Sequence, residues 1–430
     1  MKSEEMMHSN GTTAYETYSV IVPFGFLTFI TSLFNINFPN RSIPHRLIFE
    51  FNSLIVTSIL IMTILSDYAT EIIILLLILC ILLLGVFRWK DSRPPKYNRH
   101  LNYITFARST INILSVIGIL AVDFTIFPRR FAKTKVYGFS LMDVGVGLFV
   151  FSNGIVASEI RGKHHSLLKS IKGTIPLIVL GCGRFLATSK LDYNVPVSEY
   201  GVHWNFFITL AIVKLCSACI LSIVSVNRSL LIGTCLLLVH EVILQLGVAQ
   251  FVLGNTPRTT FFNANREGIV SSTGYLGLYF LSVSFGKFLS VYVYNKSRKH
   301  IFKLCIMSVF LIWATVLLNK NFGASRRLAN SGYCIWIMFI GISMVTIFYL
   351  GEIIKIFVCG CTNVPLIFEA VNYNGLPFFL CANFLTGSVN ILCDTLSADN
   401  LRSLCILIVY MMINCGVSYS LFAKSIKIKL

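Results

Sequence analysis

The sequence has 430 residues, of which 55% are hydrophobic and only 13% are charged, and its mean hydropathy is +0.76. Soluble domains carry roughly 25% charged residues, so this composition excludes a soluble globular protein and indicates an integral membrane protein. Basic residues number 36 and acidic residues 18, a formal net charge of +18. Because the basic residues sit in short loops between apolar runs, they indicate the positive-inside rule, with anionic headgroups as further partners, and not nucleic acid.

The apolar runs predict an all-α polytopic membrane protein with about thirteen transmembrane helices in one bundle, forming a single domain over residues 1–430. A hydrocarbon core about 30 Å thick requires roughly 17–25 apolar residues per helix. The expected spans lie near residues 19–35, 51–66, 70–88, 102–124, 138–159, 172–189, 205–225, 229–252, 271–294, 302–319, 332–353, 375–393 and 401–422. An odd number of spans places the two termini on opposite sides of the membrane.

The distribution of Lys and Arg among the loops predicts a lumenal N-terminus and a cytosolic C-terminus. The basic segments that this orientation assigns to the cytosol are 88–100, 161–172, 295–300 and 424–429. Two further basic loops, 127–135 and 320–327, fall on the lumenal side, where the rule does not account for them. We expect these two loops to bind an anionic lipid headgroup.

The stretch 127–153, FPRRFAKTKVYGFSLMDVGVGLFVFSN, joins a basic cluster to an apolar span that contains a carboxylate. An acidic side chain in such a span costs roughly 2.5–3.5 kcal/mol, which makes Asp143 a functional-site hypothesis. As a general base Asp143 would accept the proton of an attacking hydroxyl, with Lys133 close by to orient it or to stabilise an oxyanion. The alternative is that Asp143 pairs with Lys133 or with an arginine and holds two helices together.

Other residues of this stretch are suited to binding. The guanidinium groups of Arg129 and Arg130 grip phosphate through paired hydrogen bonds. Gly145 and Gly147 allow close approach by a neighbouring helix or a ligand. Asn153 either contacts the substrate or makes an interhelical hydrogen bond.

A second group of polar residues lies at the lumenal entrance of the seventh span, in the run SEYGVHWNFF at 198–207. His203 is another candidate for the base, because Glu199 would raise the basicity of the imidazole and fix its tautomer. Glu199 and Asn205 are also candidates for headgroup binding. The alternative is a belt of interfacial aromatic residues around Tyr200 and Trp204.

Two later segments carry further candidates. Asn265, Arg266 and Glu267 precede an apolar span and would present donors to a sugar or phosphate, unless they form a capped helix end with a solvated ion pair. Asn383 shares a helix face with Thr386 and Asn390. That polar face either joins helices or lines a cavity.

A histidine–glutamate pair lies inside one predicted span, and common catalytic motifs are absent. His240 and Glu241 fall in the middle of the eighth span, so we expect them to face the bundle and not lipid. The sequence contains no P-loop, nucleophile elbow, zinc-protease or dinucleotide-binding motif. We therefore expect no metal and no bound cofactor.

Several separated motifs resemble the family of inositol acyltransferases of glycosylphosphatidylinositol-anchor biosynthesis. These motifs are FPRRFAKTKVYGFSLMDVGVGLFVFSNGIV at 127–156, EYGVHWNFF at 199–207, SRRLANSGYCIWI at 325–337 and NYNGLPFFLCANFLTGSVNI at 372–391. The resemblance is thinner before about residue 120. It implies a multi-pass protein of the endoplasmic reticulum that transfers a fatty acyl group, typically palmitoyl, from acyl-CoA to the inositol 2-hydroxyl of glucosaminyl-phosphatidylinositol.

The residues by themselves leave a second class of function open. A lipid or ion transporter, or a flippase, would use Asp143 as an intramembrane ion site. Transporters are often built from inverted repeats with broken helices. No such repeat is visible in this sequence.

Overall fold

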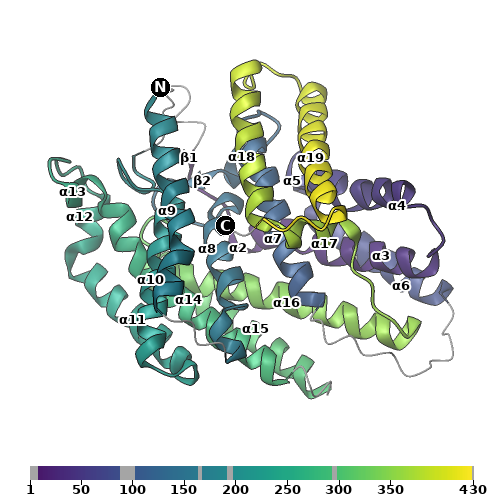
Figure 1. Ribbon diagram of the computed structural model, residues 1–430, viewed down its shortest axis with the longest axis horizontal. Helices are drawn as coiled ribbons and strands as arrows, with labels where there is room; N and C mark the ends of the chain where they lie inside the picture. The colour runs from purple at the N-terminus through teal and green to yellow at the C-terminus, as the bar shows by residue number, and fades with distance from the viewer. Residues whose placement is uncertain (1–7, 88–101, 163–166, 191–196, 293–297, 429–430) are drawn as a thin grey trace.

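A computed structural model describes residues 8–87, 102–162, 167–190, 197–292 and 298–428. Most of these residues are helical (Figure 1). The helices of the first half are α2 (Ala14–Ile21), α3 (Pro23–Asn37), α4 (Ile43–Glu50), α5 (Thr57–Met62), α6 (Ala69–Val86), α7 (Asn102–Ala121), α8 (Leu141–Gly154) and α9 (Leu167–Lys190). Those of the second half are α10 (Phe206–Ile223), α11 (Ser229–Ile243), α12 (Ala249–Leu253), α13 (Phe261–Ala264), α14 (Arg266–Tyr292), α15 (Arg298–Phe322), α16 (Ser331–Cys359), α17 (Leu366–Tyr373), α18 (Gly375–Leu392) and α19 (Asn400–Ala423).

Short elements connect or interrupt these helices. The 3₁₀ turns and π segments are Ser66–Tyr68, Arg129–Phe131, Ser158–Arg161 and Val226–Arg228 (3₁₀), and Phe51–Val56 and Leu244–Val248 (π). Two strands of two residues each, β1 (His8–Ser9) and β2 (Lys133–Thr134), pair in parallel. This pairing attaches the N-terminal segment to the basic loop that precedes α8.

Twelve helical segments of the described chain are long and apolar enough to cross a membrane. Each corresponds to one of the predicted spans. The remaining prediction, 172–189, lies in α9, which has 24 residues but contains Pro176, Lys172 and Arg184. With α9 counted, the helices of membrane length number thirteen, so the predicted all-α polytopic architecture is confirmed.

The predicted starts of the second and the ninth spans lie too late, and both differences have the same physical reason. The second span begins at Ile43, eight residues before the predicted start. The ninth predicted span, which is α14, begins at Arg266 instead of 271. In both places charged residues belong to the first turns of the helix because they are paired there. Glu50, for example, accepts hydrogen bonds from Arg46 Nε at 3.0 Å and from Asn35 Nδ2 at 2.7 Å.

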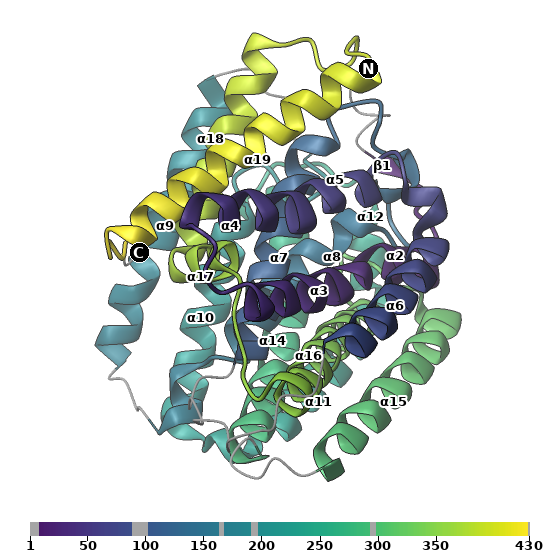
Figure 2. The ribbon, with the colours of Figure 1, turned by 90° about the vertical axis from the view of Figure 1, so that its right-hand side faces the viewer.

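Helix α16 forms the centre of the bundle. It packs against α3, α7, α8, α14 and α15, and 78% of its most apolar stretch is buried. By contrast, only 11% of the most apolar stretch of α15 is buried. Helix α15 lies along the outer edge of the molecule (Figure 2). Helices α18 and α19 pack side by side, and α18 also contacts α7. An apolar surface as exposed as that of α15 indicates contact with lipid.

The two ends of the bundle can be told apart by their contacts. One end, called here the β end, holds β1, β2 and the loop that precedes α16, where Arg327 donates to Lys135 O at 3.0 Å. Helices α8 and α16 start at the β end, and α7 finishes there. The opposite end, called here the tail end, holds the last turns of α8, α16 and α19. The described part of the chain therefore starts with β1 at the β end and finishes after α19 at the tail end.

Candidate active site

Asp143 is held by a network of hydrogen bonds at the start of α8. Its own N–H donates to the N-cap residue Ser140 at 3.2 Å, which starts the helix. Carboxylate Oδ2 accepts from Thr134 N at 3.1 Å and Thr134 Oγ1 at 2.7 Å, and Oδ1 accepts from Arg326 Nε at 2.7 Å. Asp143 is only 1% exposed. The carboxylate thus fixes the loop before α8 and the loop before α16 together.

Arg326 is the cation that pairs with Asp143, and it too is buried. Burial lowers the pKa of this guanidinium, but the carboxylates of Asp143 and Glu199 more than offset that effect, so the pKa lies above its ordinary value. The same guanidinium lowers the pKa of the Tyr200 hydroxyl, which burial raises by a larger amount. Arg326 therefore keeps its charge, and Tyr200 keeps its proton.

A tyrosine from α16 completes this cluster. Tyr333 donates its hydroxyl proton to Asp143 O at 2.8 Å and accepts from Gly147 N at 3.1 Å. Helices α8 and α16 are consequently joined by main-chain as well as side-chain contacts. The charged cluster, defined here as Asp143, Arg326, Tyr200, Tyr333, Lys133 and Glu199, lies at the β end.

Lys133 does not pair with Asp143, contrary to our expectation. Its Nζ donates to Glu199 Oε1 at 2.6 Å, because Lys133 and Thr134 are successive residues of β2 and their side chains point to opposite sides. Thr134 thus faces Asp143, while Lys133 faces the turn before α10. The lysine side chain is 31% exposed, against 9% for Glu199. Lys133 is accordingly the accessible cation of the charged cluster.

Arg129 and Arg130 already have protein partners. Arg130 pairs with Glu16 at 2.5 Å and with Asp67, which ties the N-terminal helix and the turn before α6 to the basic loop. Arg129 donates to two main-chain carbonyl oxygens, Val122 O at 2.9 Å and Phe124 O. The predicted binding of a lipid phosphate by these arginines would require some of these bonds to break.

His203 is not oriented by Glu199. It is exposed, and its imidazole lies between the rings of Phe185 and Phe261, with Asn265 Nδ2 at 3.4 Å from Nδ1. Glu199 is turned toward Lys133 instead. The sequence order alone suggested the His–Glu pair, but the turn at Gly201, with φ of +114°, directs the two side chains differently.

Asn265, Arg266 and Glu267 are buried, not solvated. Asn265 Oδ1 accepts from His203 N at 2.8 Å. Arg266 donates to the carbonyl oxygens of Val252 at 3.2 Å and Thr256 at 3.0 Å, and therefore holds the loop after α12 in place.

Glu267 sits among cations. It pairs with Arg258 at 2.5 Å and with Arg327 at 3.8 Å, and it is 0% exposed. Because its carboxylate oxygens pair with these arginines, Glu267 has a structural role.

The three remaining predicted asparagines bind main-chain groups. Asn205 caps α10 by accepting from Phe207 N at 3.1 Å, and donates to Gly181 O at 2.8 Å. Asn153 donates to Phe149 O at 3.0 Å and Asn383 to Phe379 O at 2.7 Å, each within its own helix. The prediction of an interhelical hydrogen bond from Asn153 is therefore wrong, because the partner of its side chain among the described residues, Phe149 O, belongs to the same helix, α8.

The predicted burial of His240 and Glu241 is confirmed. They are 2% and 7% exposed. His240 Nε2 lies 2.9 Å from Leu328 O, and Glu241 Oε2 accepts from Ser331 N at 2.9 Å, which caps α16. Both residues position the loop that carries Arg326.

A polar site at the tail end was not identified from the sequence. Arg108 of α7 donates to Asn372 Oδ1 at 2.9 Å and Ser152 Oγ at 3.4 Å. The positive charge of Arg161 acts on it and repels it. Within the described part of the chain, no carboxylate lies within ion-pair distance of Arg108. Its position seven residues into an apolar helix was the available signal.

Arg326 and Tyr333 were also not singled out by the sequence. They belong to the motif at 325–337, and the unexplained basic loop at 320–327 pointed to this region. Among the residues that the structure describes, no three His, Cys, Asp or Glu side chains converge as metal ligands do.

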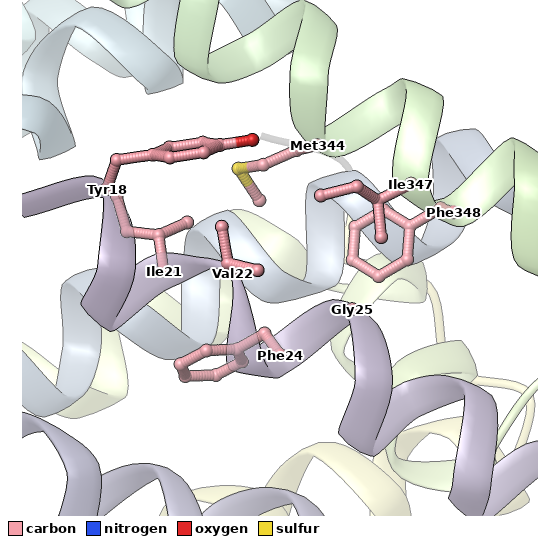
Figure 3. Close-up of a pocket in the computed structure, with 8 residues that line it drawn as sticks. All are labelled: Tyr18, Ile21, Val22, Phe24, Gly25, Met344, Ile347 and Phe348. Carbon is pink, nitrogen blue, oxygen red and sulfur yellow. The ribbon is translucent and has the colours of Figure 1, made fainter. Parts of the chain in front are cut away.

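An apolar pocket lies away from the charged cluster, between α2–α3 and α16 (Figure 3). Its lining residues are Tyr18, Ile21, Val22, Phe24, Gly25, Met344, Ile347 and Phe348. Apart from the Tyr18 hydroxyl the lining is hydrocarbon and sulfur, so this pocket offers no group for acid–base chemistry.

These observations define a polytopic all-α membrane protein with a buried charged cluster at one end of its bundle. The GWT1 family model matches residues 1–421. The chain is 35% identical to GPI-anchored wall transfer protein 1 of Schizosaccharomyces pombe, over 78% of this chain and 75% of that protein. It is 33% identical to glucosaminyl-phosphatidylinositol-acyltransferase PIGW of Homo sapiens, over 75% of this chain and 73% of that protein. The chain belongs to the GWT1 family.

Proposed function

We propose that this protein transfers a fatty acyl group from acyl-CoA to the inositol 2-hydroxyl of glucosaminyl-phosphatidylinositol in the endoplasmic reticulum membrane. The observation that carries the proposal is the match of the GWT1 family to residues 1–421, together with the name of the PIGW relatives. A buried acid–cation cluster at one end of a lipid-facing bundle supports it, because a hydroxyl nucleophile requires a proton acceptor.

In the proposed reaction the hydroxyl oxygen bonds to the thioester carbonyl carbon and the carbon–sulfur bond breaks. Asp143 takes the hydroxyl proton and returns it to the leaving thiolate, so that an ester and a free thiol are formed. A carboxylate has about four acceptor sites, and three of those on Asp143 are filled. The remaining site accepts the hydroxyl. Since Asp143 is sealed from solvent, a neighbouring side chain must move to admit the substrate.

The cations of the charged cluster would stabilise the oxyanion of the tetrahedral intermediate. One Nη nitrogen of Arg326 is buried and has no hydrogen-bond partner among the described residues, and Lys133 is the accessible alternative. Preorganised donors of this kind act strongly in a water-poor site. Exclusion of water also protects the thioester from hydrolysis.

Arg108 supports acyl-CoA as the donor. Its partner Ser152 lies nine residues after Asp143 on α8, which corresponds to about 13.5 Å along a helix axis. An extended pantetheine arm can bridge such a distance. The CoA phosphates would therefore bind Arg108 and Arg161 at the tail end while the thioester reaches the charged cluster.

The decisive experiment uses purified protein in lipid nanodiscs with labelled acyl-CoA and glucosaminyl-phosphatidylinositol. We expect an acylated lipid and one free CoA thiol for each product molecule. Phosphatidylinositol without the sugar is the control acceptor. Binding of both substrates with no acyl lipid and no thiol would contradict the proposal and favour transport.

A further inference from the structure

Asp123 is a partly buried carboxylate whose only hydrogen-bond partner in the described chain is an amide. It lies two residues after the end of α7, at the β end. Its Oδ2 accepts from Asn390 Nδ2 of α18 at 2.9 Å. No lysine or arginine of the described residues lies within ion-pair distance of it. This carboxylate therefore makes no ion-pair contact of the kind that usually accompanies a buried acid, and cations reach it only from farther away.

Asn390 has an unused acceptor beside this carboxylate. Its Nδ2 is bound to Asp123, but its Oδ1 is buried and lacks a hydrogen-bond partner among the residues described. Unpaired buried polar atoms are rare in folded proteins and call for a specific explanation. Asp123 and Asn390 together, named here the acceptor pair, thus place a carboxylate beside an amide oxygen that has no hydrogen-bond partner among the described residues.

The acceptor pair is close to the charged cluster. The charges of Lys133 and Arg129 act on Asp123 and, with the Asn390 hydrogen bond, lower its pKa, although burial raises it by a larger amount. A ligand cation would offset that burial and keep the carboxylate ionised. The chemistry that fits two clustered acceptors, one of them anionic, is an ammonium group with its three donors.

We propose that Asp123 and Asn390 bind the amino group of the glucosamine ring. This inference rests on the proposed function, since the acceptor lipid supplies the amine. An N-acetylated sugar has a neutral amide with a single N–H, so it would leave the carboxylate uncompensated. The acceptor pair therefore makes the enzyme select the free amino sugar over its N-acetyl form.

The test compares glucosaminyl- and N-acetylglucosaminyl-phosphatidylinositol with the full-length protein in nanodiscs. Both lipid binding without acyl donor and kcat/KM for acylation are measured. We expect the wild type to prefer the amino lipid by at least about tenfold in both measurements. Asp123→Asn should abolish that preference by weakening binding and lowering kcat/KM for the amino lipid. A preference retained by this variant would overturn the inference.

Two further variants make the result specific. Asp67→Asn removes another carboxylate at the β end, one that is 70% exposed and pairs with Arg130, and should keep the full preference. Asn390→Ala leaves Asp123 in place without its partner, and should reduce the preference partially even if Asp123→Asn fails to fold. An unchanged preference in Asn390→Ala would contradict the role of the pair.

The remaining outcomes separate this inference from the proposed function. A wild type that prefers the amino lipid in binding but forms no product would refute acyl transfer and leave the inference intact. Equal binding of the two lipids would refute the inference even if both were acylated. Competition by phosphatidylethanolamine that is lost in Asp123→Asn would assign the acceptor pair to that lipid amine and overturn the sugar assignment.

Discussion

At the scale of single residues, the contact that matters most is the ion pair between Asp143 and Arg326. Both side chains are almost completely buried, at 1% and 2% exposed. Removing one partner of such a pair costs about 3–5 kcal/mol because the other charge is left uncompensated, whereas replacing both partners is often tolerated. A single substitution at Asp143 therefore perturbs stability as well as any catalytic step.

A double substitution separates these two effects. We expect Asp143→Asn to reduce turnover by at least about a hundredfold, as the loss of a general base would, and also to lower thermal stability. The double variant Asp143→Asn with Arg326→Gln should recover most of the stability and remain inactive. Thermal unfolding and turnover are measured on the same samples. Recovery of activity to within a few-fold of wild type would show that Asp143 is only an ion-pair partner.

Arg108 gives a second prediction at this scale. Arg108→Gln should raise the KM for acyl-CoA by about tenfold, because it removes a phosphate contact, and leave the KM for the inositol lipid unchanged. Arg108→Lys keeps the charge and should have a smaller effect. Steady-state kinetics in both substrates check this. An equal rise in both KM values would indicate a general loss of structure.

At the scale of elements, the contact between α8 and α16 positions the charged cluster. A Cβ added to Gly147 would lie 2.5 Å from Ile337 Cγ1 and 2.8 Å from the Tyr333 hydroxyl oxygen. A Cβ at Gly145 would meet only Ser115 Oγ, at 3.5 Å. The close helix approach expected of both glycines is therefore confirmed for Gly147, and Gly145 contributes little to it.

The two glycines form a matched pair of variants. Gly147→Ala should destabilise the protein by about 1–3 kcal/mol through overpacking and lower activity, because it separates Tyr333 from the main chain of Asp143. Gly145→Ala should be close to neutral. Thermal unfolding of the two variants in the same detergent is the measurement. Equal losses of stability would contradict the packing described here.

At the scale of the whole molecule, the described residues form thirteen helices of membrane length when α9 is counted, and the first and last described residues lie at opposite ends of the bundle. The Lys and Arg distribution then predicts that the β end is lumenal and the tail end cytosolic. A tag appended after Leu430 should be digested by protease added to sealed microsomes, while a tag at the N-terminus should be protected. Protection of the C-terminal tag would reverse the orientation and place Asp143 on the cytosolic side.

The amino-acid sequence was enough to predict the class of protein and the positions of most helices, and to single out Asp143 as a functional hypothesis. These follow from local quantities: apolar length, charge content and the cost of an acid in an apolar run. The basic loop at 320–327 was also recognisable as anomalous, but its residue Arg326 is 183 positions from Asp143 in the chain. Which of the nearby basic residues pairs with Asp143 is a property of the packing between helices.

The pairing of the charged and polar side chains became visible only in the folded protein. Lys133 is ten residues from Asp143, yet the alternation of side chains in β2 turns it to Glu199, and a glycine turn separates Glu199 from its sequence neighbour His203. Likewise Asp123 meets Asn390 only because α7 and α18 pack together. Hydrophobic periodicity is read along one helix, whereas an ion pair or an unpaired acceptor depends on the distance between two helices, which no local pattern encodes.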